Sequence, residues 1–168
     1  MNKLSDYLGT ELTVIQPSVW KREIEFRSEK ELIATLAHPK FFSEKAECKI
    51  NNEIYEFYRQ KFFSRNVDIR KKGYQNPFAH LKPNFWASKG ILELPRGIKL
   101  NIKFGVFKKA AEIYEGDYDL LVTINNKISF KERCLVNIER KSEVLDEHPW
   151  IIMLAFFFAQ LRRRNSTG

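Results

Sequence analysis

The stretch HPWIIMLAFFFAQLRRRN, residues 148–165, is the most hydrophobic run of the chain. A helix that spans the ~30 Å hydrocarbon core of a bilayer needs about 20 apolar residues. The run from Trp150 to Leu161 has 12 residues and is closed by Arg162–Arg164, and as a helix it is only about 18 Å long. We therefore expect a helix that does not cross a membrane and that protein encloses on every side.

The composition indicates one compact domain. Of the 168 residues, 43% are hydrophobic and 14% aromatic, which is enough for one sizeable core. The start MNKLSDYLGTELTV lacks a charged region followed by an apolar stretch, so it predicts no secretory signal. Cys48 and Cys134 match no metal-binding spacing and are typical of buried free thiols in a reducing cytoplasm. We expect a cytoplasmic monomer, with peripheral membrane attachment left open.

Short segments with a period of two dominate the rest of the chain, as in antiparallel all-β domains. The ten candidate strands are VWKREIEFR (19–27), ELIATLA (31–37), AECKI (46–50), EIYEFYR (53–59), NVDIR (66–70), ILEL (91–94), GIKLNIKF (97–104), YDLLVTI (118–124), KISFK (127–131) and RCLVNIE (133–139). Asn51-Asn52 and Asn125-Asn126 are predicted to be hairpin turns, because asparagine tolerates the positive φ of two-residue turns.

The strands and the apolar helix together predict a fold. Closing so many strands into a barrel removes unpaired edges. A barrel of about 12 strands is too wide for its own side chains to fill, and the apolar helix is the segment that fits inside. The predicted fold is mainly β: a closed antiparallel barrel of about 12 strands around a central hydrophobic C-terminal helix.

The segments VWKREIEFRSEKELIATL and AECKINNEIYEFYR, a β-rich middle and the terminal apolar helix resemble the tubby C-terminal-like superfamily. That group includes tubby proteins, phospholipid scramblases and plant LURP-one-related proteins, and the resemblance points to a bacterial branch of it. It covers roughly residues 18–162 and implies a single tubby-like barrel domain over residues 1–168. The chain lacks the tubby phosphoinositide motif and a scramblase-like calcium motif, so the resemblance transfers no functional residue.

No motif in the sequence points to catalysis. His38, His80 and His148 belong to no metal or protease pattern, and the acidic residues of 115–119 lack the EF-hand spacing. No nucleophile elbow or glycine-rich phosphate loop is present. The sequence therefore assigns no catalytic residue, no metal and no cofactor, although an active site assembled from distant residues remains an alternative.

Positive charge is concentrated in the middle of the chain. Residues 59–109 contain 13 Lys and Arg but only Asp68 and Glu93, a balance of +11. Because the whole chain is +8, the remaining residues sum to −3. Such a basic segment attracts anionic lipid, nucleic acid or acidic proteins.

The basic segment contains RKKGYQNPFAHLKPNFWASKG (70–90), which shows no strand periodicity and is predicted to be an irregular insertion. Its lysines and aromatics, with two lysines of GIKLNIKF, suit a membrane interface. The candidate anionic-surface site is Lys71, Lys72, Lys82, Lys89, Lys99, Lys103 and Trp86. The competing interpretation is a cap, in which Phe78, Phe85 and Trp86 cover one end of the core.

Three function classes follow. The preferred one is a non-enzymatic binding module for anionic lipid or membrane surfaces, or for a protein partner. A nucleic-acid-binding protein is the alternative, although no RNP-like, KH or helix-turn-helix pattern accompanies the basic residues. An enzyme is the second alternative.

Overall fold

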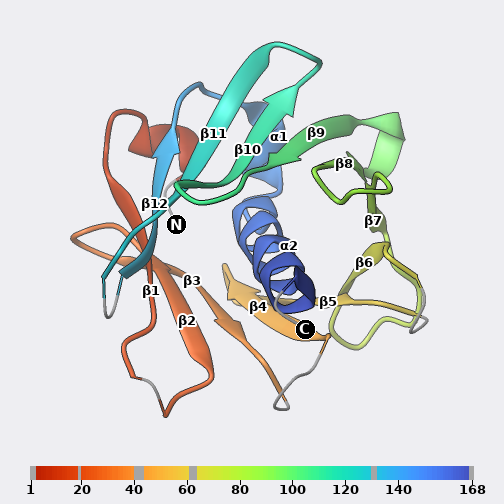
Figure 1. The fold of residues 1–168 in the computed structure, drawn as a ribbon, viewed down its shortest axis with the longest axis horizontal. Coiled ribbons are helices and arrows are strands. Elements are labelled where there is room, and N and C mark those ends of the chain that lie inside the picture. Colours follow the sequence, from red (N-terminus) through yellow and green to blue (C-terminus); the bar gives the residue numbers. More distant parts are fainter. Residues whose placement is uncertain (1–2, 19, 40–43, 61–63, 130–131, 167–168) are drawn as a thin grey trace.

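A closed antiparallel barrel of twelve strands is formed by the residues that the computed structural model describes, namely 3–18, 20–39, 44–60, 64–129 and 132–166 (Figure 1). Each strand pairs with its neighbour in sequence, and β12 returns to pair with β1. The strands are β1 Leu12–Ile15, β2 Glu23–Arg27, β3 Leu32–Ala37, β4 Ala46–Ile50, β5 Glu53–Tyr58, β6 Val67–Lys71, β7 Ala79–Pro83, β8 Lys89–Glu93, β9 Lys99–Phe104, β10 Lys109–Glu115, β11 Asp119–Asn126 and β12 Glu132–Ile138. The helices are η1 Leu4–Tyr7, η2 Pro95–Gly97, α1 Glu143–Glu147 and α2 Ile151–Ser166.

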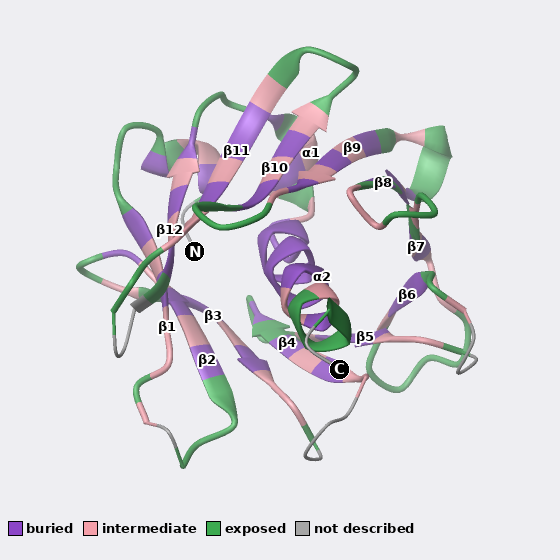
Figure 2. Ribbon diagram, in the orientation of Figure 1, coloured by how far each residue is buried: buried purple, intermediate pink, exposed green. Residues whose placement is uncertain are grey.

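Helix α2 runs through the centre of the barrel, where the ring of strands surrounds it (Figures 1 and 2). Every residue from Ile151 to Ala159 is buried, and so is Leu161. Phe157 illustrates the packing, because its ring centroid lies 5.9 Å from that of Phe57 on β5. The predicted fold, a mainly β barrel around an apolar C-terminal helix, is confirmed. No helix in the described part of the chain is long and apolar enough to cross a bilayer.

Most predicted strands are present, with two kinds of error. The sequence pattern missed β1, β7 and β10, and it wrongly placed a strand at 127–131, since residues 127–129 are not in a strand and residues 130–131 lie outside the described ranges. Asn51-Asn52 form the expected turn, with φ values of 53° and 61°. Asn125-Asn126 instead continue β11, where they pair with β12.

The segment 70–90 is not an irregular insertion, which corrects the prediction. It contains the end of β6, the whole of β7 and the start of β8. In β7, Ala79 and Leu81 are buried while Lys82 is exposed. The alternation is short and ends at Pro83, which pairs with Gly90, and a proline at that place hides a strand from a search for periodicity.

The connections between strands alternate between the two ends of the barrel, because successive strands are antiparallel. At one end, Trp150 directly before α2 packs against Tyr55 and Phe78. At the other end, Arg162 near the end of α2 donates a hydrogen bond to the carbonyl oxygen of Gly105, between β9 and β10. We call this second end, with the connections β1–β2, β3–β4, β5–β6, β7–β8, β9–β10 and β11–β12, the arginine mouth.

Candidate functional site

The lysines proposed from the sequence lie on strands and their ends, and three of them are engaged by carboxylates. These ion pairs are Lys71 with Glu53 at 2.7 Å, Lys72 with Glu47 at 3.0 Å and Lys82 with Glu93 at 2.8 Å. The hydrogen bond from Lys71 lowers the pKa of the Glu53 carboxyl below its ordinary value. Much of the positive charge on this wall is therefore compensated locally.

The remaining lysines belong to β8 and β9. Lys103 lies over the ring of Tyr114, 4.4 Å from its centroid, Lys89 is opposite Lys103 in the β8–β9 register, and Lys99 is opposite Glu93. Of the seven proposed residues, only Trp86 lies at the hollow that opens between the strand connections of the arginine mouth. Lys61, which contributes to the charge of residues 59–109, lies outside the described ranges.

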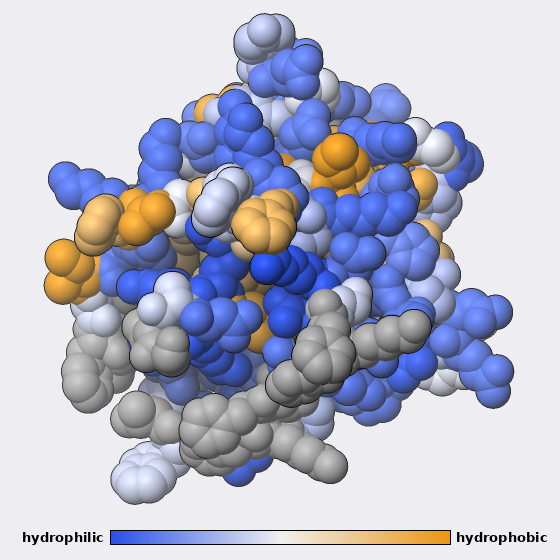
Figure 3. Space-filling model, turned by 45° about the vertical axis from the view of Figure 1, so that its right-hand side comes forward, coloured by the Kyte–Doolittle hydropathy of each residue, from blue (hydrophilic) through white to orange (hydrophobic). Residues whose placement is uncertain are grey.

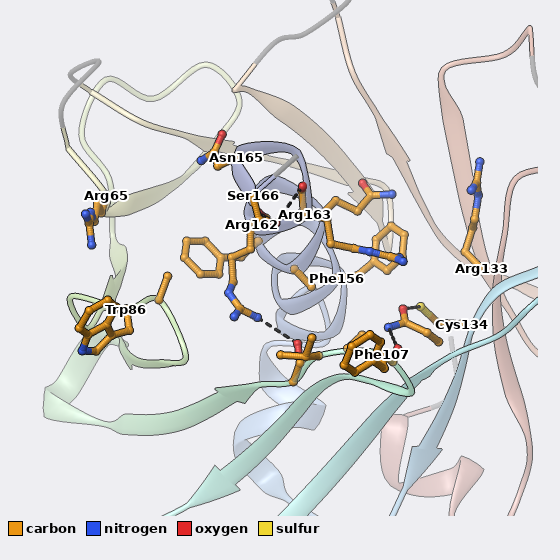
Figure 4. Close-up of a pocket in the computed structure, with 18 of the residues that line it drawn as sticks. Arg65, Trp86, Phe107, Arg133, Cys134, Phe156, Arg162, Arg163, Asn165 and Ser166 are labelled. Atoms are coloured by element: carbon orange, nitrogen blue, oxygen red, sulfur yellow. Dashed lines mark hydrogen bonds between the residues drawn. The ribbon is translucent and has the colours of Figure 1, made fainter. Parts of the chain in front are cut away.

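A hollow of about 1450 Å³ opens at the arginine mouth (Figure 4). Its walls are the β5–β6, β7–β8, β9–β10 and β11–β12 connections, and the last turns of α2 form its floor and one side. These segments are distant in sequence and are brought together by the closure of the barrel.

The charge of the hollow is one-sided. Among its described lining residues there is no Asp or Glu, and the cations are Arg59, Arg65, Lys127, Arg133, Arg162 and Arg163. Arg65 donates to the carbonyl of Phe85, and Arg162 donates to that of Gly105 at 3.2 Å (Figure 4). Burial lowers the pKa of the Arg162 guanidinium, yet an arginine remains charged at neutral pH. The hollow therefore presents a positive field to an incoming ligand.

Apolar side chains surround the same opening. Phe85 is 72% exposed, Trp86 78% and Phe107 88%, while Val106 and Ile128 are also exposed and line the hollow. Figure 3 shows hydrophobic side chains, several of them next to one another, on a mainly hydrophilic surface. Exposed apolar groups gathered around a cationic opening indicate an interaction site.

The interpretation that Phe78, Phe85 and Trp86 cover one end of the core is correct for Phe78 and wrong for the other two. Phe78 does cover an end of the core, since its ring packs edge-on against buried Trp150 with centroids 5.7 Å apart. The expectation for Phe85 and Trp86 is wrong: they are exposed, and they pack on one another with ring centroids 5.0 Å apart. Arg65 lies over the Phe85 ring at 4.9 Å, which holds this aromatic pair at the rim.

Buried polar atoms without partners also lie here. The Nε of Arg59 and the Oε1 of Gln160 have no hydrogen-bond partner among the described residues, and both residues line the hollow. The Arg59 side chain is only 10% exposed, and one of its terminal nitrogens pairs with Glu44 at 3.2 Å. His38 lies close to Gln160, and burial lowers the pKa of its imidazole against a smaller opposing effect of the Gln160 side chain.

The described residues that line the hollow include no histidine and no carboxylate that could act as a base toward a serine or cysteine. Burial raises the pKa of the Cys134 thiol to about 12, and its sulfur is 3.6 Å from Oδ1 of Asn126, so the reactive thiolate is disfavoured. Among the described residues no group of three or more His, Cys, Asp or Glu side chains is placed to hold a metal ion.

Comparisons with protein-family models, curated proteins and solved structures find no match to this chain.

Proposed function

We propose that the protein is a non-enzymatic module that binds anionic membrane surfaces through the arginine mouth. The observation that carries this proposal is the coincidence, at one end of the barrel, of six cationic side chains with no Asp or Glu among the described lining residues, although Arg59 is paired with Glu44 outside the lining, and a rim of exposed apolar side chains. Aromatic rings favour the depth of the lipid headgroups, and cations favour the phosphates around them.

The expected free energy of binding is adequate for reversible attachment to a membrane. Each Lys or Arg near an anionic membrane contributes about 1 kcal/mol, and burying an exposed phenylalanine-sized side chain contributes about 1.5–3 kcal/mol. Several of each act together at the mouth. The lysines of the outer wall contribute less, because carboxylates already neutralise Lys71, Lys72 and Lys82.

The apolar rim also favours lipid over nucleic acid. Trp86 and Phe107 can stack on bases, but the aliphatic side chains of Val106 and Ile128 cannot. Both aliphatic residues are exposed beside the hollow. By contrast, both the aromatic and the aliphatic side chains of this rim can insert between lipid headgroups.

The test is flotation with vesicles of phosphatidylcholine alone or mixed with phosphatidylserine. Replacing Arg65 and Arg133, which both line the hollow, by glutamine should weaken binding to the anionic vesicles by about 30-fold, from two contributions of about 1 kcal/mol. The matched control replaces Lys71 and Lys72 by glutamine, which removes the same charge from the ion-paired wall and should weaken binding by less than about threefold.

Equal losses in the two double variants would place binding outside the mouth and contradict the proposal. Retention of single-stranded nucleic acid in a gel, together with indifference to anionic vesicles at low salt, would replace it with the nucleic-acid alternative. Melting temperatures of both variants should match the wild type, because all four side chains are exposed.

A further inference from the structure

The hollow has a larger volume than attachment to a membrane surface requires. Its floor is apolar, formed by Phe156, Phe158 and Ala159 of α2 with Ala110 of β10 and Cys134 of β12. Ligand pockets in proteins usually measure about 300–1000 Å³, and the hollow is at least that large at about 1450 Å³. These five side chains are 1–7% exposed, and the apolar atoms that they present to the hollow favour an acyl chain over a polar occupant.

Two buried polar atoms of residues that line the hollow indicate which polar group a ligand would carry. The Nε of Arg59 is a buried donor without a partner, and Oε1 of Gln160 is a buried acceptor without one in the described part of the chain. Leaving such a group unsatisfied costs about 1–3 kcal/mol. A ligand that satisfies both carries an oxygen that accepts from Arg59 and a hydroxyl that donates to Gln160.

The charged residues of the hollow indicate that the polar group of the ligand is anionic. Arg162 and Arg163 line the same hollow, and none of its described lining residues is a carboxylate. A phosphate monoester provides anionic oxygens, and its glycerol carries a hydroxyl. A fatty acid carboxylate is anionic but lacks the hydroxyl, and a choline head brings a cation into a cationic site.

We propose that the hollow binds one molecule of a monoacyl glycerol phosphate, with the phosphate at Arg59 and Arg162, the glycerol hydroxyl at Gln160 and the chain along Phe156 and Phe158. This inference rests on the proposed function, because it assigns the ligand class of the same mouth. The ligand is taken either from a membrane leaflet or as a free monomer from solution.

The experiment is calorimetric titration with lysophosphatidic acid below its micellar concentration, beside lysophosphatidylcholine of the same chain length and glycerol 3-phosphate. The expected result is a single site, at which lysophosphatidic acid binds at least tenfold more tightly than either comparison ligand. Arg59→Lys keeps the charge but removes the Nε donor, and it should weaken binding by about tenfold.

Gln160→Met removes the acceptor at similar volume and should weaken lysophosphatidic acid binding by about fivefold. It should leave the melting temperature unchanged or raised, because a buried unpaired acceptor disappears. Lys99→Gln on β9 is the control and should change nothing. Equal affinity for the choline analogue, many sites per chain, or full affinity in both hollow variants would overturn the inference.

Vesicle flotation separates this inference from the proposed function. If anionic vesicles bind but monomeric lysophosphatidic acid does not, the ligand assignment is wrong and the membrane proposal stands. If the monomer binds at one site but vesicles do not float the protein, the membrane proposal is wrong and the hollow remains a site for a free amphiphile. If both bind, transfer from vesicles to the protein gives the source of the ligand.

Discussion

The ring of Phe78 meets the indole of Trp150 edge-on, with the ring centroids 5.7 Å apart and the planes at 85°. The indole also lies 5.7 Å from the ring centroid of Tyr55. Three aromatic side chains from β5, from the β6–β7 connection and from the start of α2 thus pack at one end of the barrel. The arginine mouth at the other end is hollow, so the two ends differ in packing.

This aromatic cluster should be a major source of stability. Trp150 is fully buried, and Trp150→Ala should lower the free energy of unfolding by about 3–5 kcal/mol. Phe78 is half-buried, so Phe78→Ala should cost less. Urea unfolding followed by circular dichroism measures both, and a loss below about 1 kcal/mol for Trp150→Ala would show that the indole is not part of the core.

The enclosed position of α2 is tested by Phe157→Asp. Phe157 is completely buried between the wall and the helix, and an unpaired carboxylate there costs several kcal/mol. We expect an unfolded or aggregated product in size-exclusion chromatography. Phe157→Leu, the control, should stay folded with a lower melting temperature. A folded, monomeric Asp variant is the result that the fold does not allow.

Stability should fall in acid through Glu56. Burial raises the pKa of this carboxyl, but hydrogen bonds from Lys45 and Arg70 outweigh that effect and hold the pKa below its ordinary value of 4.5. The carboxylate lies 2.6 Å from Lys45 and 2.5 Å from Arg70. Because the pKa is lowered in the folded state, the stabilisation is complete above about pH 4.5 and is lost as the pH falls through the folded pKa.

Urea titrations at pH 7, 5 and 3 measure this contribution. Glu56→Gln should cost about 2 kcal/mol at pH 7, and its difference from the wild type should shrink as the pH falls below 4.5. The exposed pair of Glu53 with Lys71 supplies the control, since Glu53→Gln should cost less than about 1 kcal/mol. A difference that grows in acid would have the wrong sign.

A carboxylate placed in the arginine mouth should weaken binding to anionic vesicles. Ser166 lines the hollow, and its hydroxyl donates to the carbonyl of Arg162 at 3.0 Å. Ser166→Asp should reduce flotation with anionic vesicles by about fivefold or more, because it offsets the charge of a neighbouring arginine. Ser166→Asn has similar size and no charge and should bind like the wild type; equal weakening by both substitutions would exclude an electrostatic cause.

The strands could be predicted from the sequence where one face of the strand is buried and the other is not. In AECKI, Ala46, Cys48 and Ile50 face α2 while Lys49 is exposed, and β4 has the bounds that the alternation gives. In β10, Ala110 and Ala111 are both buried beside a register shift. Such a bulge breaks the period of two, so the strand could not be found from periodicity.

The site could be predicted only in part, because it is assembled from connections that are distant in sequence. Trp86 was singled out, but its association with Arg162 depends on barrel closure, which no local pattern encodes. Three of the lysines that enter the charge count, Lys71, Lys72 and Lys82, are paired with carboxylates of other strands. A usable signal existed in Val106 and Phe107: a turn directly after Gly105 has no core of its own, so two apolar residues there indicate surface recognition.

The place of α2 after all twelve strands also has a consequence for synthesis. Leu12 of β1 pairs with Val136 of β12, and the side chains that fill the barrel come later still. At ~5–20 residues per second, roughly ten seconds separate the emergence of β1 from that of α2. Throughout that interval the inner faces of the nascent strands lack the side chains that cover them in the folded protein, so we expect the growing chain to become compact only after α2 has been made.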